Sequence, residues 1–132
     1  RNTNEETRAF LKEALVRVAT STADAYRAQA EVKFPIGGGA VVNDARCSEI
    51  AASAARDSAG AAALIQHPSL MASENYGDFL RAYPGVFALV GARNPDCGAC
   101  YPHHHPKFNI DEKAMARGAA LHAQYAVNFF NS

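Results

Sequence analysis

The sequence predicts an α/β fold, because segments with a helical spacing of apolar residues alternate with short apolar segments typical of strands. The expected order is helix, strand, glycine turn, helix, strand, helix, strand, loop and helix. The chain has 132 residues, of which 48% are hydrophobic and 20% charged, as in a single globular domain. This alternation favours layers of helices packed on a sheet.

The first predicted element is an amphipathic helix over residues 4–28, in which apolar side chains recur along one face. Thr3 and Glu6 fit a T-x-x-E capping box, which satisfies free N–H groups of the first turn. Residues 29–36 then alternate apolar and polar side chains, which predicts a half-buried strand. Pro35 ends this strand or places it at the edge of a sheet.

Three consecutive glycines, Gly37–Gly39, mark the one internal boundary that we expect. Ordering consecutive glycines costs conformational entropy, so they suit a hinge or a sharp turn. An ordinary hairpin turn is the alternative. We therefore expect residues 1–40 and 41–132 to belong to different domains.

The remaining elements are a helix over 44–60, a short apolar strand over 61–65, a helix over 74–82, a buried strand over 86–90 and a helix over 110–130. Asn43–Asp44 caps the first of these helices, and Ser73–Glu74 begins the second. Asn109 and Glu112 open the third.

Composition and charge exclude several classes of partner. Thirteen basic residues balance thirteen acidic ones, and a sequence-independent grip on nucleic acid or anionic lipid needs a basic excess. No apolar stretch approaches the roughly 20 residues that cross a bilayer, and the polar first residues do not resemble a signal peptide. Three cysteines, an odd number, argue against a secreted disulfide framework. We therefore expect a cytoplasmic protein that binds neither nucleic acid nor membrane.

A long polar loop over residues 92–108 contains the dense cluster of cysteine and histidine, namely Cys97, Cys100 and His103–His105. Imidazole is the commonest protein ligand of divalent transition metals, but adjacent side chains point apart, so one or two of the histidines could bind an ion. The Cys-x-x-Cys pair with His103 or His105 could form a zinc site, although such sites usually have two separated pairs. Alternatively, one histidine contributes to a site completed outside this chain, or the loop is simply solvated.

Two segments carry a resemblance to a known family. Tyr101–Glu112 reads Y-P-H-H-H-P-K-F-N-I-D-E, and Met71–Tyr76 reads M-A-S-E-N-Y. They resemble Y-P-L-H-H-P-K-F-D-I-D-E and M-G-S-E-D-F in the metal-dependent amidohydrolases that include hippurate hydrolases, N-acyl-amino-acid amidohydrolases and auxin-conjugate hydrolases. Further colinear matches, from the stretch after Arg1 to Gly118–Leu121, extend the resemblance over nearly the whole chain.

The resemblance implies a longer enzyme, in which an α+β lid domain is inserted into a catalytic α/β domain of the zinc-peptidase type. Residues 1–40 would finish the lid, which often mediates dimerisation, and residues 41–132 would finish the catalytic domain. We therefore expect this chain to be the C-terminal part of the enzyme. Its expected partner is a second copy or the missing N-terminal part.

The resemblance also implies two divalent ions, zinc, manganese or similar, in each intact active site. Aligned on H-H-P, the metal ligand that this chain supplies is His104, and His103 stands where the family has leucine. The family's other ligand segments and its general-base glutamate have no counterpart here. We therefore expect no catalytic residue in this chain and no activity from the chain alone.

The substrate implied by the resemblance is a small N-acyl amino acid, such as hippurate, whose amide bond is hydrolysed. Arg1 could bind the substrate carboxylate, because a planar guanidinium matches that group. Asn43, Ser73 and Glu74 complete the expected substrate-binding residues. Two other functions are compatible with the sequence: a stand-alone metal-binding or redox module using Cys97, Cys100 and the histidines, and a dimerisation module built on the first helix and strand.

Overall fold

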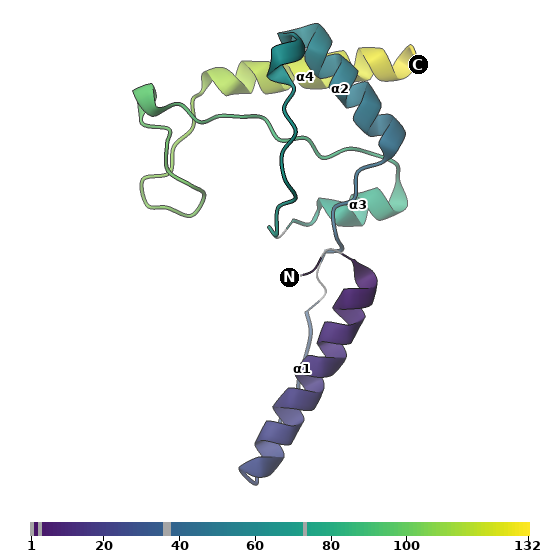
Figure 1. The fold of residues 1–132 in the computed structure, drawn as a ribbon, viewed down its shortest axis with the longest axis vertical. Coiled ribbons are helices and arrows are strands. Elements are labelled where there is room, and N and C mark those ends of the chain that lie inside the picture. Colours follow the sequence, from purple (N-terminus) through teal and green to yellow (C-terminus); the bar gives the residue numbers. More distant parts are fainter. Residues whose placement is uncertain (1, 3, 36–37, 73) are drawn as a thin grey trace. The chain divides into compact units, whose positions relative to one another are not determined.

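The computed structural model describes residues 2, 4–35, 38–72 and 74–132, and within these ranges it contains four α-helices (Figure 1). They are α1 (Glu5–Ala25), α2 (Ala45–Ala59), α3 (Tyr76–Ala82) and α4 (Lys113–Phe130). Each lies within a few residues of a predicted helix, so the helical part of the prediction is confirmed. Among the described helices, none combines the length and the apolar character that crossing a bilayer requires.

The chain divides into two compact units. The first comprises Arg1–Val42 and Pro68–Pro84, and the second comprises Asn43–His67 and Gly85–Ser132. The expected assignment of residues 1–40 to a lid and of the rest to a catalytic domain stays a prediction.

The predicted strands at 29–36, 61–65 and 86–90 are wrong for the described residues, none of which lies in a β-strand. The second of these segments begins as a 3-10 turn, and the other two are irregular. A strand requires a neighbouring strand that supplies partners for its N–H and C=O groups. In the described part of the chain, a single antiparallel bridge between Asn94 and Ala99 is the one such pairing. The apolar patterns are therefore present without the sheet that they predict.

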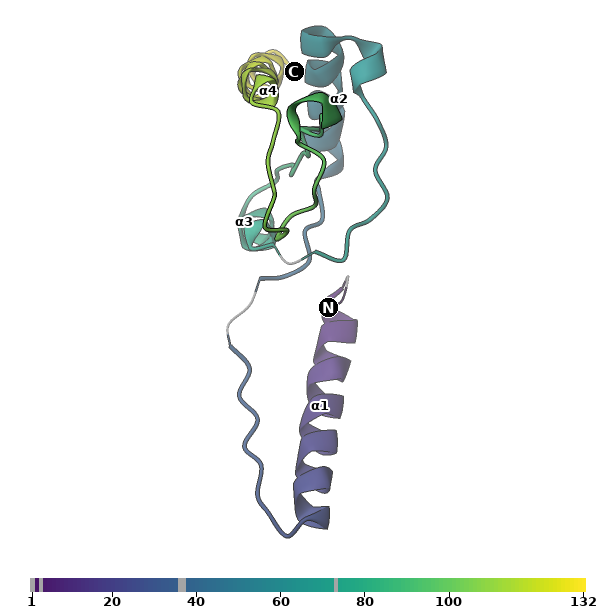
Figure 2. The ribbon, with the colours of Figure 1, turned by 90° about the vertical axis from the view of Figure 1, so that its left-hand side faces the viewer.

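The first unit begins with α1, which is capped differently from the prediction. The side chain of Asn4 accepts a hydrogen bond from the backbone N–H of Thr7 at 2.7 Å, while Thr3 of the predicted capping box lies outside the described residues. The helix ends at Ala25, and two residues later Arg27 has a left-handed backbone with φ of +55° and donates its N–H back to the carbonyl of Asp24. This turn sends the following segment back along α1 (Figure 2).

Glycines let two backbone segments of the first unit approach closely. A Cβ atom on Gly77 would lie 2.6 Å from the carbonyl oxygen of Gly39 and 2.8 Å from that of Ala40. A Cβ atom on Gly38 would lie 2.8 Å from the carbonyl oxygen of Glu74. Backbone atoms cannot yield to such contacts without moving the chain. The described part of the glycine segment therefore serves close packing against α3, and Gly37 lies outside the described residues.

The second unit is built on α2 packed against α4 (Figure 1). Cys47, Ile50 and Ala54 are buried on one face of α2. Small side chains on that face allow a second helix to pack closely. Asp44 caps α2 by accepting the backbone N–H of Cys47 at 2.9 Å, and this hydrogen bond holds the pKa of the Asp44 carboxyl below its usual value.

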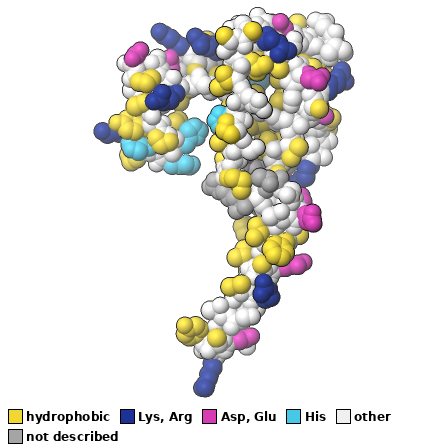
Figure 3. All heavy atoms as spheres, in the orientation of Figure 1, with side chains coloured by type: hydrophobic (Ala, Val, Ile, Leu, Met, Phe, Trp, Pro, Cys, Tyr) yellow, Lys and Arg dark blue, Asp and Glu magenta, His cyan; other side chains and the backbone are white. Residues whose placement is uncertain are grey.

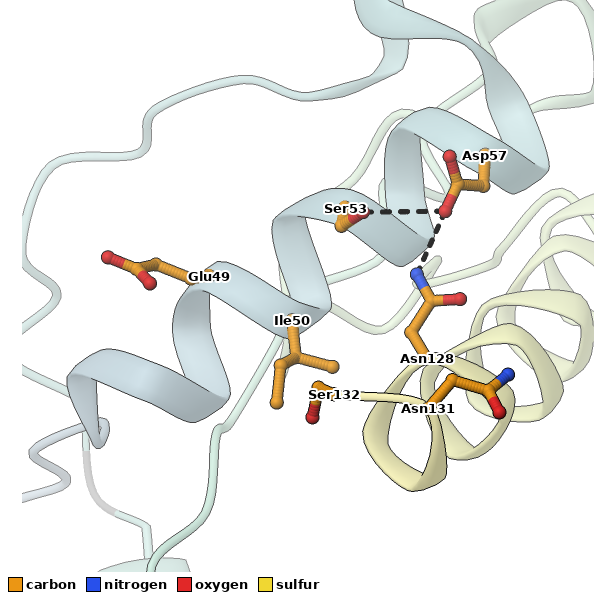
Figure 4. Close-up of a pocket in the computed structure, with 7 residues that line it drawn as sticks. All are labelled: Glu49, Ile50, Ser53, Asp57, Asn128, Asn131 and Ser132. Carbon is orange, nitrogen blue, oxygen red and sulfur yellow. Dashed lines mark hydrogen bonds between the residues drawn. The ribbon is translucent and has the colours of Figure 1, made fainter.

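Polar side chains connect α2 and α4 beside a surface hollow of about 430 Å³ (Figure 4). The Asp57 carboxylate accepts hydrogen bonds from Asn128 Nδ2 at 2.8 Å and from Ser53 Oγ at 3.4 Å. The Arg46 guanidinium donates to Ser132 Oγ at 3.2 Å. Asp57, Asn128 and Ser53 line the hollow and bond to one another, so their polar groups serve the packing of the two helices.

Replacing Gly77 by alanine should destabilise the first unit, although alanine normally stabilises a helix relative to glycine. The new methyl group would meet two backbone carbonyls, and overpacking of this kind costs about 1–3 kcal/mol. Gly118→Ala in α4 is the matched control, because its Cβ meets only a Val90 methyl at 3.9 Å, so it should stabilise by up to about 1 kcal/mol. Urea unfolding of both variants measures the difference, and equal effects would contradict the packing described.

Candidate functional site

The loop over residues 92–111 is closed at its base by Asp111. The Asp111 carboxylate accepts Asn94 Nδ2 at 2.9 Å with one oxygen and the backbone N–H of Lys113 at 3.0 Å with the other. Its own N–H donates to the carbonyl of Ala92 at 2.9 Å. The Asn94 amide, and then the Lys113 N–H, keep the pKa of the Asp111 carboxyl below its usual value. One side chain therefore joins both ends of the loop to the start of α4.

This arrangement corrects the predicted opening of the last helix. The helix begins at Lys113, and the side chain of Glu112, at its N-cap position, makes no capping hydrogen bond. Asn109 also makes none within the described part of the chain. Asp111 supplies the bond instead, two residues before the helix starts. A short acidic side chain just before a helix is a usual capping residue, so the sequence could have indicated it.

The tip of the loop is a tight turn from Pro102 to His105, with His104 in a left-handed conformation. The His105 N–H donates to the carbonyl of Pro102 at 3.2 Å, and the φ angle of His104 is +67°. Few residues other than glycine adopt this backbone, and those that do often lie at functional sites. The exposed His104 side chain makes no hydrogen bond, ion pair or ring contact with the described residues. Its imidazole is therefore available to an external ligand such as a metal ion.

The two neighbouring histidines are engaged within the loop. The ring of His103 packs edge-on against Phe108 with 4.9 Å between centroids, and the ring of His105 stacks on Tyr101 at 4.4 Å. His105 Nδ1 also accepts a backbone N–H at 3.0 Å. Of the three, His104 is thus the one whose side chain makes no such contact with the described residues, and its role as a metal ligand stays a prediction.

The same loop borders a second hollow of about 430 Å³, whose lining includes Arg93, Cys100, His103 and Phe108. Figure 3 shows histidine side chains at the surface, gathered among hydrophobic ones. In the ranges that the structure describes, no three histidine, cysteine, aspartate or glutamate side chains are grouped so that they could hold an ion. The zinc site that the Cys-x-x-Cys spacing allowed is thus not assembled by these residues.

The other predicted site residues are placed as follows. Arg1 and Ser73 lie outside the described residues. Glu74 belongs to the first compact unit, whereas Asn43 and His104 belong to the second. One Glu74 carboxylate oxygen accepts the backbone N–H groups of Asn75 at 2.8 Å and Tyr76 at 3.1 Å, so this side chain caps the start of α3. Its expected role in substrate binding stays a prediction.

Asn43 holds an extended segment of the second unit. Its Nδ2 donates to the carbonyl of Phe87 at 3.1 Å, and its Oδ1 accepts the Phe87 N–H at 2.8 Å. The adjacent Asp44 N–H donates to the carbonyl of Gly85 at 2.9 Å. The amide thus pairs with the backbone as a neighbouring strand would. A contact between Asn43 and a substrate stays a prediction.

Comparison with known proteins relates the chain to a peptidase family and to several proteins named as hydrolases or peptidases. The sequence model of peptidase family M20/M25/M40 matches residues 4–128. The chain is 29% identical to thermostable carboxypeptidase 2 of Saccharolobus solfataricus over 99% of its length, and 30% identical to the putative amidohydrolase YhaA of Bacillus subtilis over 98%. It is also 34% identical over 48% of its length to an IAA-amino acid hydrolase, ILR1-like 6, of Arabidopsis thaliana.

These alignments cover only part of each relative. The chain spans 33% of the carboxypeptidase, 33% of the putative amidohydrolase and 14% of the IAA-amino acid hydrolase. No solved structure matches the chain.

Replacing Asp111 by asparagine should open the loop. An amide in place of the carboxylate faces the Asn94 and Lys113 donors with a single acceptor oxygen, so one hydrogen bond is lost. Limited trypsin digestion should cleave after Lys107 several-fold faster in the variant. Cleavage after Lys33, in the other compact unit, serves as the internal control and should be unchanged. An unaltered rate at Lys107 would contradict the role of Asp111.

The same carboxyl should make the loop sensitive to acid. Because its pKa is lowered in the folded state, ionised Asp111 stabilises the fold above the unfolded pKa of about 3.8. This stabilisation should be lost as the pH falls from about 5 through 3.8 to the lower folded-state pKa. An NMR titration of the Lys113 amide measures it, and D111N should remove the transition. If the transition persists in D111N, another titrating group causes it, and the role given to Asp111 is contradicted.

Proposed function

Because the chain belongs to peptidase family M20/M25/M40, we propose that it is the C-terminal part of a metal-dependent amidohydrolase that cleaves N-acyl amino acids. The names of its relatives include amidohydrolase, carboxypeptidase and IAA-amino acid hydrolase, all of which denote hydrolysis at a carbonyl carbon. Family membership also implies an α/β fold, whose sheet would be completed by segments beyond these 132 residues. The amide of a small acylated amino acid, of the hippurate kind, is the proposed substrate.

The conformation of His104 carries this proposal. The left-handed turn presents an exposed imidazole that has no partner among the described residues, and Asp111 fixes the base of the loop that bears it. A catalytic ion typically has three protein ligands and one open position. His104 could therefore supply one ligand of such a set, and the remaining ligands would come from another part of the protein.

A divalent metal fits the donor that this chain offers, since neutral imidazole is the commonest protein metal ligand and suits zinc; manganese would draw more on oxygen ligands from elsewhere in the protein. When bound, such ions activate a water molecule for attack on the amide carbonyl. His104 would hold the metal, because its ring takes part in neither of the ring contacts that His103 and His105 make. The general base would lie outside this chain, so we propose that the chain alone does not hydrolyse amides.

Substrate recognition is proposed for Arg1, Asn43, Ser73 and Glu74. The Arg1 guanidinium would form a bidentate ion pair with the carboxylate of the amino-acid half. Asn43 and Glu74 both hold backbone segments through their side-chain oxygens, so their contribution would be to position the substrate-facing loops. The Asn43 oxygen keeps one lone pair for a ligand, and the second carboxylate oxygen of Glu74 keeps both of its own.

The exposed apolar surface supports a partner for the chain. Phe10, Leu15 and Val18 on α1 are 66%, 56% and 56% exposed. Helices in proteins draw most of their stability from packing an apolar face. We propose that either a second copy in a homodimer or the missing N-terminal part of the enzyme covers these side chains.

The proposal is tested by the same substitution at two adjacent histidines in the protein that carries this chain. His104→Leu should lower hydrolysis of N-acyl amino acids at least about 100-fold and release bound metal, because a ligand is lost. His103→Leu is the matched control and should retain both, since leucine can still pack against Phe108. Activity assays with metal analysis measure both. If the two variants behave alike, His104 is not the ligand.

A further pair of experiments separates the ligand role from a backbone role. His104→Gly suits the left-handed turn, so the folded state should keep its stability within about 1 kcal/mol while metal binding is lost. Metal analysis of Cys97→Ser tests the alternative of a self-contained module. One ion held per chain by this protein, and lost in C97S but retained in H104G, would establish that alternative.

A further inference from the structure

Two of the three cysteines are exposed on the loop that leads to the histidines, and the third is buried. Cys47 is 3% exposed in the face of α2, whereas Cys97 and Cys100 are both solvent-exposed. The proposed hydrolysis uses neither exposed thiol. Exposure is one of the conditions for a thiol to react with a small disulfide molecule.

The chain turns sharply around the two exposed cysteines, which are three residues apart. Asn94 and Ala99 exchange backbone hydrogen bonds of 2.8 and 2.9 Å, which reverses the chain between them. Gly98 takes a left-handed φ of +77°, and its carbonyl accepts the N–H of Cys100 at 3.0 Å. A disulfide needs Cα atoms about 4.4–6.8 Å apart, much less than an extended three-residue separation. The bend at Gly98–Cys100 shortens the separation of the two cysteines in the direction that a disulfide requires.

From the exposed pair and this turn, we infer that Cys97 and Cys100 form a reversible disulfide when they meet a low-molecular-weight disulfide such as oxidised glutathione. One cysteine sulfur attacks the small disulfide, forms a mixed disulfide and releases one thiol, which takes the proton. The second cysteine sulfur attacks the first, closes the intrachain bond and releases the second thiol. The two cysteines are oxidised by two electrons, and the small disulfide is reduced to two thiols.

The disulfide would stiffen the segment that precedes the histidines. Cys100 is followed directly by Tyr101, whose ring stacks on His105, and Cys100 lines the same hollow as His103. Ala99, between the two cysteines, is 2% exposed and anchors the turn. The bond would therefore cross-link the turn on the side that leads to the His104 tip. The alternative to a disulfide is a metal ion bound by these two cysteines, which would need at least one more ligand.

Trypsin places both cysteines in one peptide, residues 94–107, because the chain has Arg93 before it and Lys107 at its end. The protein is incubated with oxidised glutathione, its remaining thiols are blocked, and the mass of this peptide is then measured. The expected form is lighter by two hydrogens than the reduced peptide and carries no blocking group. Dithiothreitol should restore two free thiols. Cys47, in the separate peptide 47–56, is the internal control and should react only after denaturation.

Two surface variants define the outcome. Cys97→Ser and Cys100→Ser should each abolish the internal disulfide and leave one glutathione on the remaining cysteine. The inference is overturned if the unaltered protein carries two glutathiones on this peptide or links only between chains. It is also overturned if one zinc ion per chain protects both thiols and is released by C97S. Two glutathiones on the peptide, or links only between chains, would leave the His104 proposal untouched. A zinc ion released by C97S would also favour the self-contained module, and metal analysis of H104G shows whether the His104 proposal fails with it.

Discussion

The hydrogen bonds of one carboxylate, Asp111, fix the geometry on which the candidate site depends. They join the start of the loop at Asn94, the end of the loop and the first turn of α4. Because both ends of the loop are tied at one point, its base is anchored at the start of α4. The α4 helix in turn packs on α2. A tip residue held in this way can keep a strained backbone such as that of His104, which a free loop would relax.

The helices could be predicted from the sequence, and the strands could not be confirmed, for one physical reason. A helix satisfies its hydrogen bonds within its own segment, so spacing and caps over residues such as 44–60 suffice to locate it. A strand at 86–90 depends on partners that its own sequence does not contain. In the structure, the side chain of Asn43 supplies such a partner to Phe87, where a neighbouring strand would normally do so. The apolar pattern identified these segments, but whether each of them forms a strand depends on a neighbouring strand that its own sequence does not specify.

The candidate site shows the same division. The motif around His104 could be recognised in the sequence, which already selected this histidine by alignment, and its ligand role stays a prediction. The left-handed turn at His104 and the ring contacts of His103 and His105 are details that spacing does not reveal. Asn94 and Asp111 were missed because they lie far apart in the sequence and meet only when the loop closes. The packing role of Gly77 was hidden for a similar reason, since its close contacts are with residues 39–40.

The most direct measurement of the central claim is a crystal structure of the zinc-loaded protein that carries this chain, with the metal located by its anomalous scattering. The account predicts an anomalous peak about 2.0–2.1 Å from an imidazole nitrogen of His104, with the other ligands contributed from outside these 132 residues. A peak between Cys97 and Cys100, or a fully ligated metal with His104 turned toward solvent, would contradict it.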